Sequence, residues 1–222
     1  KLANRLVGVG VAAPLWLGGW RDFLGAPTNV MDAWNEIDIC CRIQTMTSLP
    51  VEFAKDTTAA CVAELVAGQG RRLRNYLYLF IGTFIGGGLV IDGHLYPGST
   101  GNAGAVGSLP LRSEEGKEPP QLLHKASGFV LEQIFKQYGH APAAAHDERA
   151  MSKPMEKQTT AWLKEACPAL ALTITSATAL LDLDAVVVDG SMHRSLIDRI
   201  VGETAGVLDS YSWEGPTRPH SL

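Results

Sequence analysis

Two glycine-rich segments contain the residues of this chain that are best suited to binding a ligand or taking part in a reaction. The first, residues 82–88, reads GTFIGGG and lies between two apolar runs, Tyr76–Ile81 and Leu89–Ile91. These runs predict the buried strands of a hairpin whose loop is almost entirely glycine and threonine. Glycine lets backbone amides approach a ligand closely, and successive amides together with the Thr83 hydroxyl could bind an anion. A tight turn without any ligand is the alternative interpretation of the glycine triplet.

The second segment, Gly98–Gly107, favours the ligand interpretation. Polar side chains stand among its glycines or directly follow them: Ser99, Thr100, Asn102 and Ser108. We therefore expect the bends of both segments to border one crevice.

An aspartate at a strand-to-helix junction is the candidate for acid–base chemistry. Leu49–Phe53 predicts a short strand and Ala59–Ala67 a helix, with Asp56 between them. A carboxylate near a helix N-terminus stays ionised and could act as a general base, or it could simply cap the helix. The neighbouring Lys55 could pair with this carboxylate and lower its basicity, or it could favour an anionic ligand.

Residues 81–108, IGTFIGGGLVIDGHLYPGSTGNAGAVGS, resemble the signature region of the ROK family of bacterial repressors, uncharacterised open reading frames and sugar kinases. The family pattern is roughly IGTGIGGGIVINGKLYRGANGLAGEIGH, with the same glycines and spacing. The resemblance implies that Asp56 is the base that takes the proton from the sugar hydroxyl attacking the γ-phosphate. It also implies a set of phosphate- and nucleotide-binding residues: Gly82, Thr83, Gly86, Gly87, Gly88 and Gly190.

Other positions depart from the family pattern. The family segment AGEIGH contains a glutamate and a histidine that bind sugar hydroxyls, and the histidine also ligates zinc; here Ala105 and Ser108 take their places. The family's zinc-binding cysteines correspond to residues 111–122, LRSEEGKEPPQL, which contain no cysteine, so we expect no zinc and no other metal there. Asp189 replaces a glycine of the family's VIGGG turn, where it could cap the next helix but would crowd or repel a nucleotide.

The ligand-binding residues that the resemblance implies come from three parts of the chain. Glu132, in a segment like the family's GCLE, could equally be a solvated acid. The full set is Lys55, Asp56, Asn102, Gly104, Ala105, Ser108 and Glu132.

The remaining pattern alternates buried strands with amphipathic helices, which is typical of α/β proteins. Residues 6–11 and 183–188 predict strands. The pattern predicts helices over residues 32–47, 122–138, 156–181 and 194–208. We expect the helix over 156–181 to be broken or bent at Pro168. Asn35 and Asp38 are candidate caps of the first helix. Residues 139–153 predict a linker or surface loop, where we expect no metal at His140 and His146.

Composition is typical of a globular protein, with 222 residues, 46% hydrophobic residues and a net charge of −4. The charge gives no reason to expect nucleic-acid contact from this chain itself. No apolar run reaches the roughly 20 residues of a membrane span, and the apolar start, interrupted by glycine and proline, reads as a strand and loop rather than a signal peptide. Four cysteines without C-x-x-C spacing favour buried thiols in a cytoplasmic protein.

The resemblance implies an actin-like ATPase (ribonuclease-H-like) α/β fold, with mixed sheets flanked by helices. We expect residues 1–222 to form a partial sugar-kinase-type domain of two lobes, incomplete at both ends. The favoured function is the sugar-sensing effector domain of a transcriptional regulator, which would contact DNA only through a domain outside this chain. The alternative is an ATP-dependent hexose kinase, and only this alternative requires ATP and Mg²⁺. A sugar ligand and a homodimer are expected in either case, and no membrane.

Overall fold

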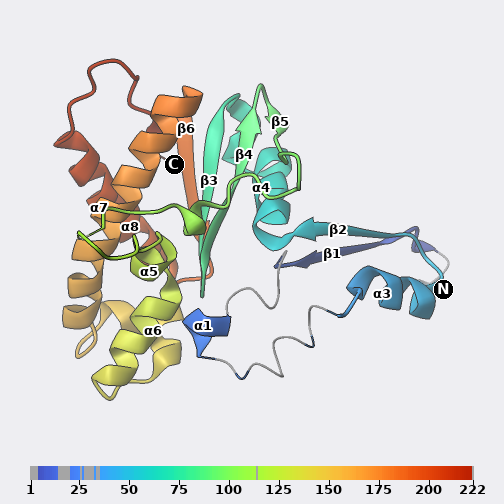
Figure 1. The fold of residues 1–222 in the computed structure, drawn as a ribbon, viewed down its shortest axis with the longest axis horizontal. Coiled ribbons are helices and arrows are strands. Elements are labelled where there is room, and N and C mark those ends of the chain that lie inside the picture. The colour runs from blue at the N-terminus through green and yellow to red at the C-terminus, as the bar shows by residue number, and fades with distance from the viewer. Residues whose placement is uncertain are drawn as a thin grey trace.

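The computed structural model describes residues 5–14, 21–25, 27, 33, 36–113 and 115–221. Its strands form two sheets (Figure 1). The smaller sheet is a parallel pair, β1 (Val9–Ala13) and β2 (Val51–Lys55). The larger sheet has the order β5–β4–β3–β6–β7, where the strands are β3 (Tyr76–Ile81), β4 (Ile85–Ile91), β5 (His94–Leu95), β6 (Ala185–Gly190) and β7 (His220–Ser221).

The larger sheet is mixed, as the sequence predicts. β3 pairs antiparallel with β4, placing Tyr76 opposite Val90, and parallel with β6, placing Tyr76 opposite Ala185. The short edge strand β7, which the sequence pattern does not predict, pairs parallel with β6.

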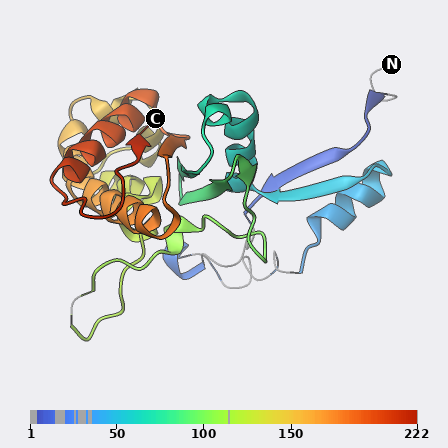
Figure 2. The same ribbon diagram turned by 90° about the horizontal axis from the view of Figure 1, so that it is seen from above.

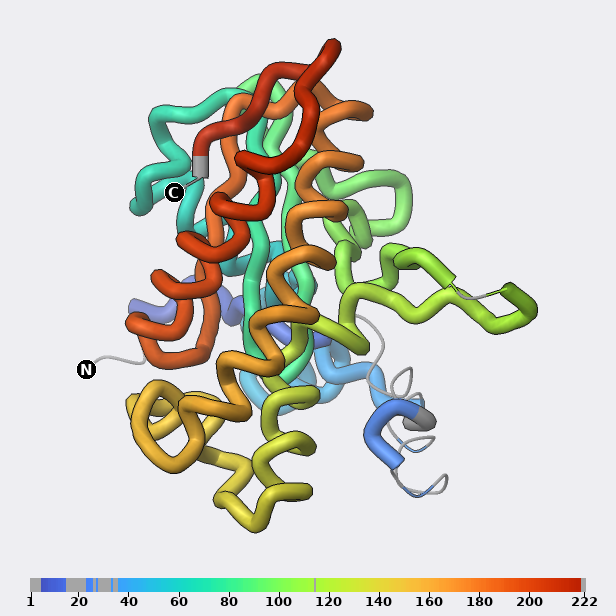
Figure 3. Tube along the Cα trace, turned by 90° about the vertical axis from the view of Figure 1, so that its left-hand side faces the viewer, coloured from blue at the N-terminus to red at the C-terminus, as the bar shows by residue number. Residues whose placement is uncertain are grey.

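Alternation of side chains along β3 divides the core into two layers. Leu77, Leu79 and Ile81 are buried in a cluster with side chains of helices α5 (Leu123–Ala126), α6 (Gly128–Gln137), α7 (Glu156–Leu181) and α8 (Arg194–Asp209). Figure 3 looks onto this side of the molecule, where α7 and α8 lie across the strands. Tyr76 and Tyr78 point to the opposite face and pack with Cys61 of helix α4 (Asp56–Ala67).

The glycine triplet lies in β4 and not in the hairpin loop, so that expectation is wrong. Gly86, Gly87 and Gly88 pair with Phe80, Leu79 and Tyr78, and the loop is only Gly82-Thr83-Phe84. The reason is packing, because α4 crosses the sheet at the triplet. A β-carbon on Gly88 would lie 2.5 Å from Cβ of Cys61, and one on Gly86 would lie 2.8 Å from Cγ2 of Thr57.

The helical segments differ from the predicted pattern in three places. The helix expected over residues 122–138 is divided at Ser127, whose backbone is extended. Helix α7 runs without a break through Pro168. Residues 139–153, expected to be a loop, contain the 3₁₀ helices η4 (Pro142–His146) and η5 (Glu148–Met151).

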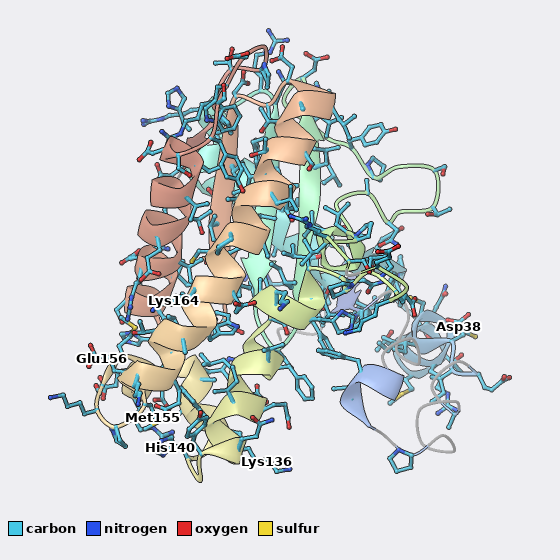
Figure 4. The ribbon with its side chains drawn as sticks, turned by 60° about the vertical axis from the view of Figure 1, so that its left-hand side comes forward. Asp38, Lys136, His140, Met155, Glu156 and Lys164 are labelled. Atoms are coloured by element: carbon cyan, nitrogen blue, oxygen red, sulfur yellow. The ribbon has the colours of Figure 1, made fainter. Side chains whose placement is uncertain are left out.

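The N-terminal part of the chain extends away from the larger sheet, as Figure 2 shows for β1 and β2. Helix α3 (Ile39–Thr47) is capped as expected by Asp38, whose carboxylate accepts a hydrogen bond from the Cys41 amide at 2.8 Å (Figure 4). Asn35 lies outside the described residues. Helix α1 (Arg21–Leu24) places the Phe23 ring 4.9 Å from the Phe129 ring of α6. None of the helices in the described ranges is both long and apolar enough to cross a membrane.

Candidate functional site

A cavity of about 580 Å³ lies where the β2–α4 junction meets one end of the larger sheet. Its walls bring together eight of the residues selected from the sequence: Lys55, Asp56, Gly82, Thr83, Gly86, Asn102, Ala105 and Ser108. These residues come from segments up to 53 positions apart in the chain. The expected common crevice for Asp56 and the two glycine-rich segments is therefore present.

Four of the selected glycines lie behind the cavity wall. Gly87 and Gly88 are buried in β4, and Gly104 packs against Gly88, where an added β-carbon would lie 2.7 Å from Cα of Gly88. Gly190 lies against β3, where a β-carbon would lie 2.1 Å from the Ile81 carbonyl oxygen. These glycines permit the close packing that shapes the wall.

Asp56 begins α4 and does not occupy its cap position, so the alternative expectation of a plain N-cap is wrong. Lys55 holds the cap position, and it makes no side-chain capping bond. The Asp56 carboxylate accepts a hydrogen bond from the Thr57 amide at 2.7 Å and is exposed on the cavity wall. A carboxylate held in this way keeps an oxygen available to accept a proton or a hydrogen bond from a ligand hydroxyl.

Lys55, at the end of β2, is buried with only 9% of its surface exposed. Its ammonium group donates to the Ala103 carbonyl oxygen at 3.1 Å and to Oδ1 of Asn102 at 3.4 Å. Burial lowers the pKa of Lys55, while the charge of Asp56 acts in the opposite direction. No ion pair joins Lys55 to a carboxylate within the part of the chain that the structure describes, so the expected direct pairing with Asp56 is not observed.

The β3–β4 turn is fixed by the start of α6. The Gly82 amide donates to the Phe84 carbonyl oxygen at 2.8 Å. The Gly82 and Thr83 carbonyl oxygens accept from the Gly128 and Phe129 amides at 2.8 and 2.9 Å. Thr83 is left exposed on the cavity wall, where its hydroxyl can meet a ligand.

The second glycine-rich segment is a series of bends that ends in the 3₁₀ helix η3 (Val106–Ser108). Gly98, Gly101 and Gly104 have positive φ angles of 74–75°, a conformation that other residues adopt at a cost. These bends place Ala105 and Ser108 on the cavity wall. The departures from the ROK pattern at these two positions therefore fall on the wall itself.

Glu132 lies outside the cavity lining. Its Oε1 is 2.6 Å from Nε2 of His146, so α6 and η4 are joined by this pair. The part of Glu132 in ligand binding remains a prediction. Among the described residues no group of three or more histidine, cysteine or acidic side chains could hold a metal ion.

Asp189 faces back toward the sheet. Its carboxylate accepts from the Tyr78 hydroxyl at 3.1 Å and from the Gly190 amide at 2.8 Å. Burial and the adjacent carboxylate hold the pKa of Tyr78 above its ordinary range. The expected capping role is wrong, because His193 occupies the cap of α8 and its ring nitrogen accepts from the Ser195 amide.

Sequence reasoning missed several residues that also line the cavity: Pro14, Thr57, Phe80, Phe84, Ile85, Gly107, Gln121 and Ser191. Two of them carried a usable signal, since Thr57 directly follows Asp56 and Ser191 ends the turn that resembles VIGGG. Gln121 had no signal, because its segment stood out only for its lack of cysteine.

Comparison with known proteins places these observations in a family context. The family model described as ROK family matches residues 1–220. A glucokinase of Halalkalibacterium halodurans is 29% identical over 116 residues, which is 52% of this chain and 34% of that protein. The xylose repressor of Bacillus subtilis is 29% identical over 106 residues, 48% of this chain and 27% of the repressor.

Solved structures show the same architecture. The Lmo2764 protein from Listeria monocytogenes superposes with a TM-score of 0.73 at 19% identity, covering 99% of this chain and 75% of that one. The α/β actin-like fold with mixed sheets is thereby confirmed. The chain spans only about a third of the glucokinase and about a quarter of the repressor.

Proposed function

This chain belongs to the ROK family, and from that premise we propose that it is the sugar-sensing effector part of a transcriptional regulator. The relatives include both a glucokinase and a xylose repressor, so membership of the family is compatible with catalysis and with sensing. The choice between them rests on the cavity wall.

The observation that carries the proposal is the pair Ala105 and Ser108 on that wall. In the ROK pattern these positions hold a glutamate and a histidine that bind sugar hydroxyls. A methyl group cannot accept a hydrogen bond, and phosphoryl transfer depends almost wholly on positioning and charge stabilisation. The cavity thus keeps a place for a sugar while losing groups that would hold it for reaction.

In the proposed mechanism a sugar lies between the β2–α4 junction and the larger sheet. The Asp56 carboxylate accepts hydrogen bonds from its hydroxyl groups, and Asn102 and Ser108 add further polar contacts. A ligand that touches both parts binds a closed arrangement better than an open one, and this difference in affinity shifts the population. A DNA-binding domain outside this chain would respond to the shift.

A kinase is the second candidate, and one observation favours it. Asp56 is exposed in the same cavity as Thr83 and Gly86, which is the arrangement that a base and a phosphate-binding turn require. In that case ATP would supply the phosphoryl group, Gly82, Thr83 and Gly86 would hold its phosphates, and Asp56 would take the proton from the sugar hydroxyl.

Two measurements on the same protein distinguish these candidates. A coupled ATP-consumption assay with glucose, xylose and N-acetylmannosamine should give no turnover above background. Thermal-shift titration against a wider sugar panel should give saturable stabilisation that Asp56→Asn removes. Turnover that Asp56→Asn abolishes would overturn the regulator proposal in favour of the kinase, and the absence of both turnover and a stabilising sugar would overturn both candidates.

The proposal also includes a cytoplasmic location and a homodimer. The location is supported by four free thiols, which a reducing compartment maintains. Cys61 and Cys167 are buried as expected, whereas Cys41 is exposed and Cys40 is only partly buried, so the expectation of burial is wrong for these two. Light scattering on the purified protein would give the mass in solution and so test the dimer.

A further inference from the structure

The cavity contains a buried cation, the Lys55 ammonium group, that forms no ion pair with a carboxylate of the described residues. Lys55 and Asp56 are the charged members of the described lining, and the other lining residues are apolar or neutral. Asp56 is exposed, whereas Lys55 is 9% exposed. The positive charge is therefore the one that the fold has removed from water.

Within the described residues, the hydrogen bonds of Lys55 leave one of its donors without a protein partner. An ammonium group has three donors, and here two of them meet neutral oxygens of Ala103 and Asn102, the second at the long distance of 3.4 Å. Buried charges in proteins are ordinarily paired, because an unpaired one carries a large desolvation cost. Burial accordingly lowers the pKa of Lys55.

A charge of this kind at the wall of an open cavity is suited to an anionic group on the ligand. Such a group would meet Lys55 beside Asn102, at the second glycine-rich segment. Asp56, exposed at the neighbouring position, would repel an anion and would instead accept hydrogen bonds from hydroxyl groups. The two adjacent residues thus divide the cavity into a side for charge and a side for hydroxyls.

From this arrangement we propose that the ligand is an anionic sugar, a monosaccharide that carries one carboxylate or phosphate, and that Lys55 selects it over the neutral parent sugar. This inference rests on the proposed function, namely on carbohydrate binding in this cavity. It adds the charge of the ligand and the residue that recognises it.

The test is isothermal titration of the whole chain with matched probes: glucose, glucuronate, glucose 6-phosphate and inorganic phosphate, followed by the corresponding galactose series. We expect an acidic or phosphorylated sugar to bind at least about tenfold more tightly than its neutral parent, which corresponds to about 1.4 kcal/mol. The carboxylate and phosphate arms show which of the two anionic groups is preferred. Inorganic phosphate should bind weakly, because it lacks the sugar hydroxyl groups that would donate hydrogen bonds to Asp56.

Substitutions assign the preference to Lys55. Lys55→Gln removes the charge but keeps donors for Asn102 and Ala103, and it should abolish the preference for the anionic sugar. Lys55→Arg should retain part of it. Lys136→Gln is the matched control, because Lys136 is an exposed lysine toward the far end of α6, and it should change nothing (Figure 4). Should Lys55→Gln fail to fold, Lys55→Met tests the same loss of charge.

The outcomes separate the two proposals. Neutral sugars that bind as tightly as their anionic forms, or a preference that survives Lys55→Gln, would refute the role of Lys55 and leave sugar sensing intact. If no carbohydrate of either kind binds, carbohydrate sensing itself fails, and the inference fails with it.

Discussion

At the scale of single residues, Lys55 and Asp56 differ in environment although they are neighbours. Lys55 ends β2 and turns inward to the second glycine-rich segment, while Asp56 opens α4 and faces solvent in the cavity. A strand-to-helix junction produces this contrast, because the direction of the chain changes between the two residues. The contrast has consequences for stability as well as for binding.

We expect Lys55→Met to stabilise the ligand-free protein by about 1 kcal/mol, a rise in Tm of about 3 °C. A methionine fits a similar volume without the cost of a buried ammonium group. Because burial lowers the pKa of Lys55 from its ordinary 10.5, that cost is fully present below the folded-state pKa and is relieved as pH rises toward 10.5. The advantage of Lys55→Met should therefore shrink at alkaline pH.

Thermal unfolding of both proteins from neutral pH to pH 10.5 checks this prediction. A lower Tm for Lys55→Met at neutral pH would mean that the hydrogen bonds to Ala103 and Asn102 outweigh desolvation.

Asp189 gives a second prediction at this scale. Asp189 lies in β6 and replaces a glycine of the ROK pattern's VIGGG turn, which the resemblance places against adenosine, and we expect negative charge there to disfavour a nucleotide. Asp189→Gly should increase affinity for ADP by about tenfold, as measured by calorimetry. It should also lower Tm, because the buried Tyr78 hydroxyl loses its partner.

The control for this variant is Asp182→Gly. Asp182 ends α7 with a φ of 50°, which glycine adopts readily, so the change removes a carboxylate without straining the backbone. It should leave ADP affinity unchanged. Equal ADP affinity in Asp189→Gly and the unaltered protein would show that this carboxylate does not exclude nucleotides.

At the scale of elements, the position of α4 depends on the glycines of β4. Gly86 and Gly88 leave room for Thr57 and Cys61 on the facing helix. Gly88 also packs closely against Gly104 of the second glycine-rich segment. The same close packing brings Asp56, at the start of α4, to the cavity. The triplet therefore acts on function through the placement of a helix.

Gly88→Ala should destabilise the protein by about 2 kcal/mol, since its methyl group would lie 2.5 Å from Cβ of Cys61. Chemical denaturation measures the loss. Cys61→Ala should rescue this variant only in part, because it removes the contact with Sγ at 2.8 Å but leaves the closer contact with Cβ. Gly206→Ala in α8 is the control: its surroundings are open, and alanine favours a helix by up to about 1 kcal/mol. A neutral Gly88→Ala would refute the packing role.

How far the sequence predicts these elements depends on the kind of information each requires. Hydrophobic periodicity located β3, β6, α7 and α8 closely, because each buries a regular face. The glycine triplet was wrongly expected in the hairpin loop, because glycine is typical both of turns and of close packing within a strand. Only the approach of α4 decides between the two. The sequence pattern also allowed either a break or a bend at Pro168, and the break is wrong, because packing on both sides of the proline maintains one helix.

At the scale of the whole molecule, the cavity is a property of tertiary structure. The family resemblance located half of its lining residues, because the spacing shared with the family pattern carries tertiary information that single residues lack. Three features could not be predicted from the sequence and are seen only in the structure. They are the direction of the Lys55 side chain, the hydrogen bond between Asp189 and Tyr78, and the position of Glu132 outside the lining. Each depends on a partner at least 14 positions away in the sequence.

The last prediction concerns how ligand binding is distributed over the molecule. A ligand held by Asp56 on one side and by the two glycine-rich segments on the other should slow amide hydrogen exchange at three separate places: residues 55–58, 82–86 and 98–108. At 100 times Kd, binding stabilises the native state by about 2.7 kcal/mol, so Tm should rise by roughly 5–10 °C. Exchange measured by mass spectrometry, with the sugar of lowest Kd from the titration panel, tests this pattern.

Asp56→Asn at the same sugar concentration is the control and should show little protection. Protection confined to one of the three places would mean that the ligand contacts a single wall, and the proposed shift between open and closed arrangements would then lack a cause.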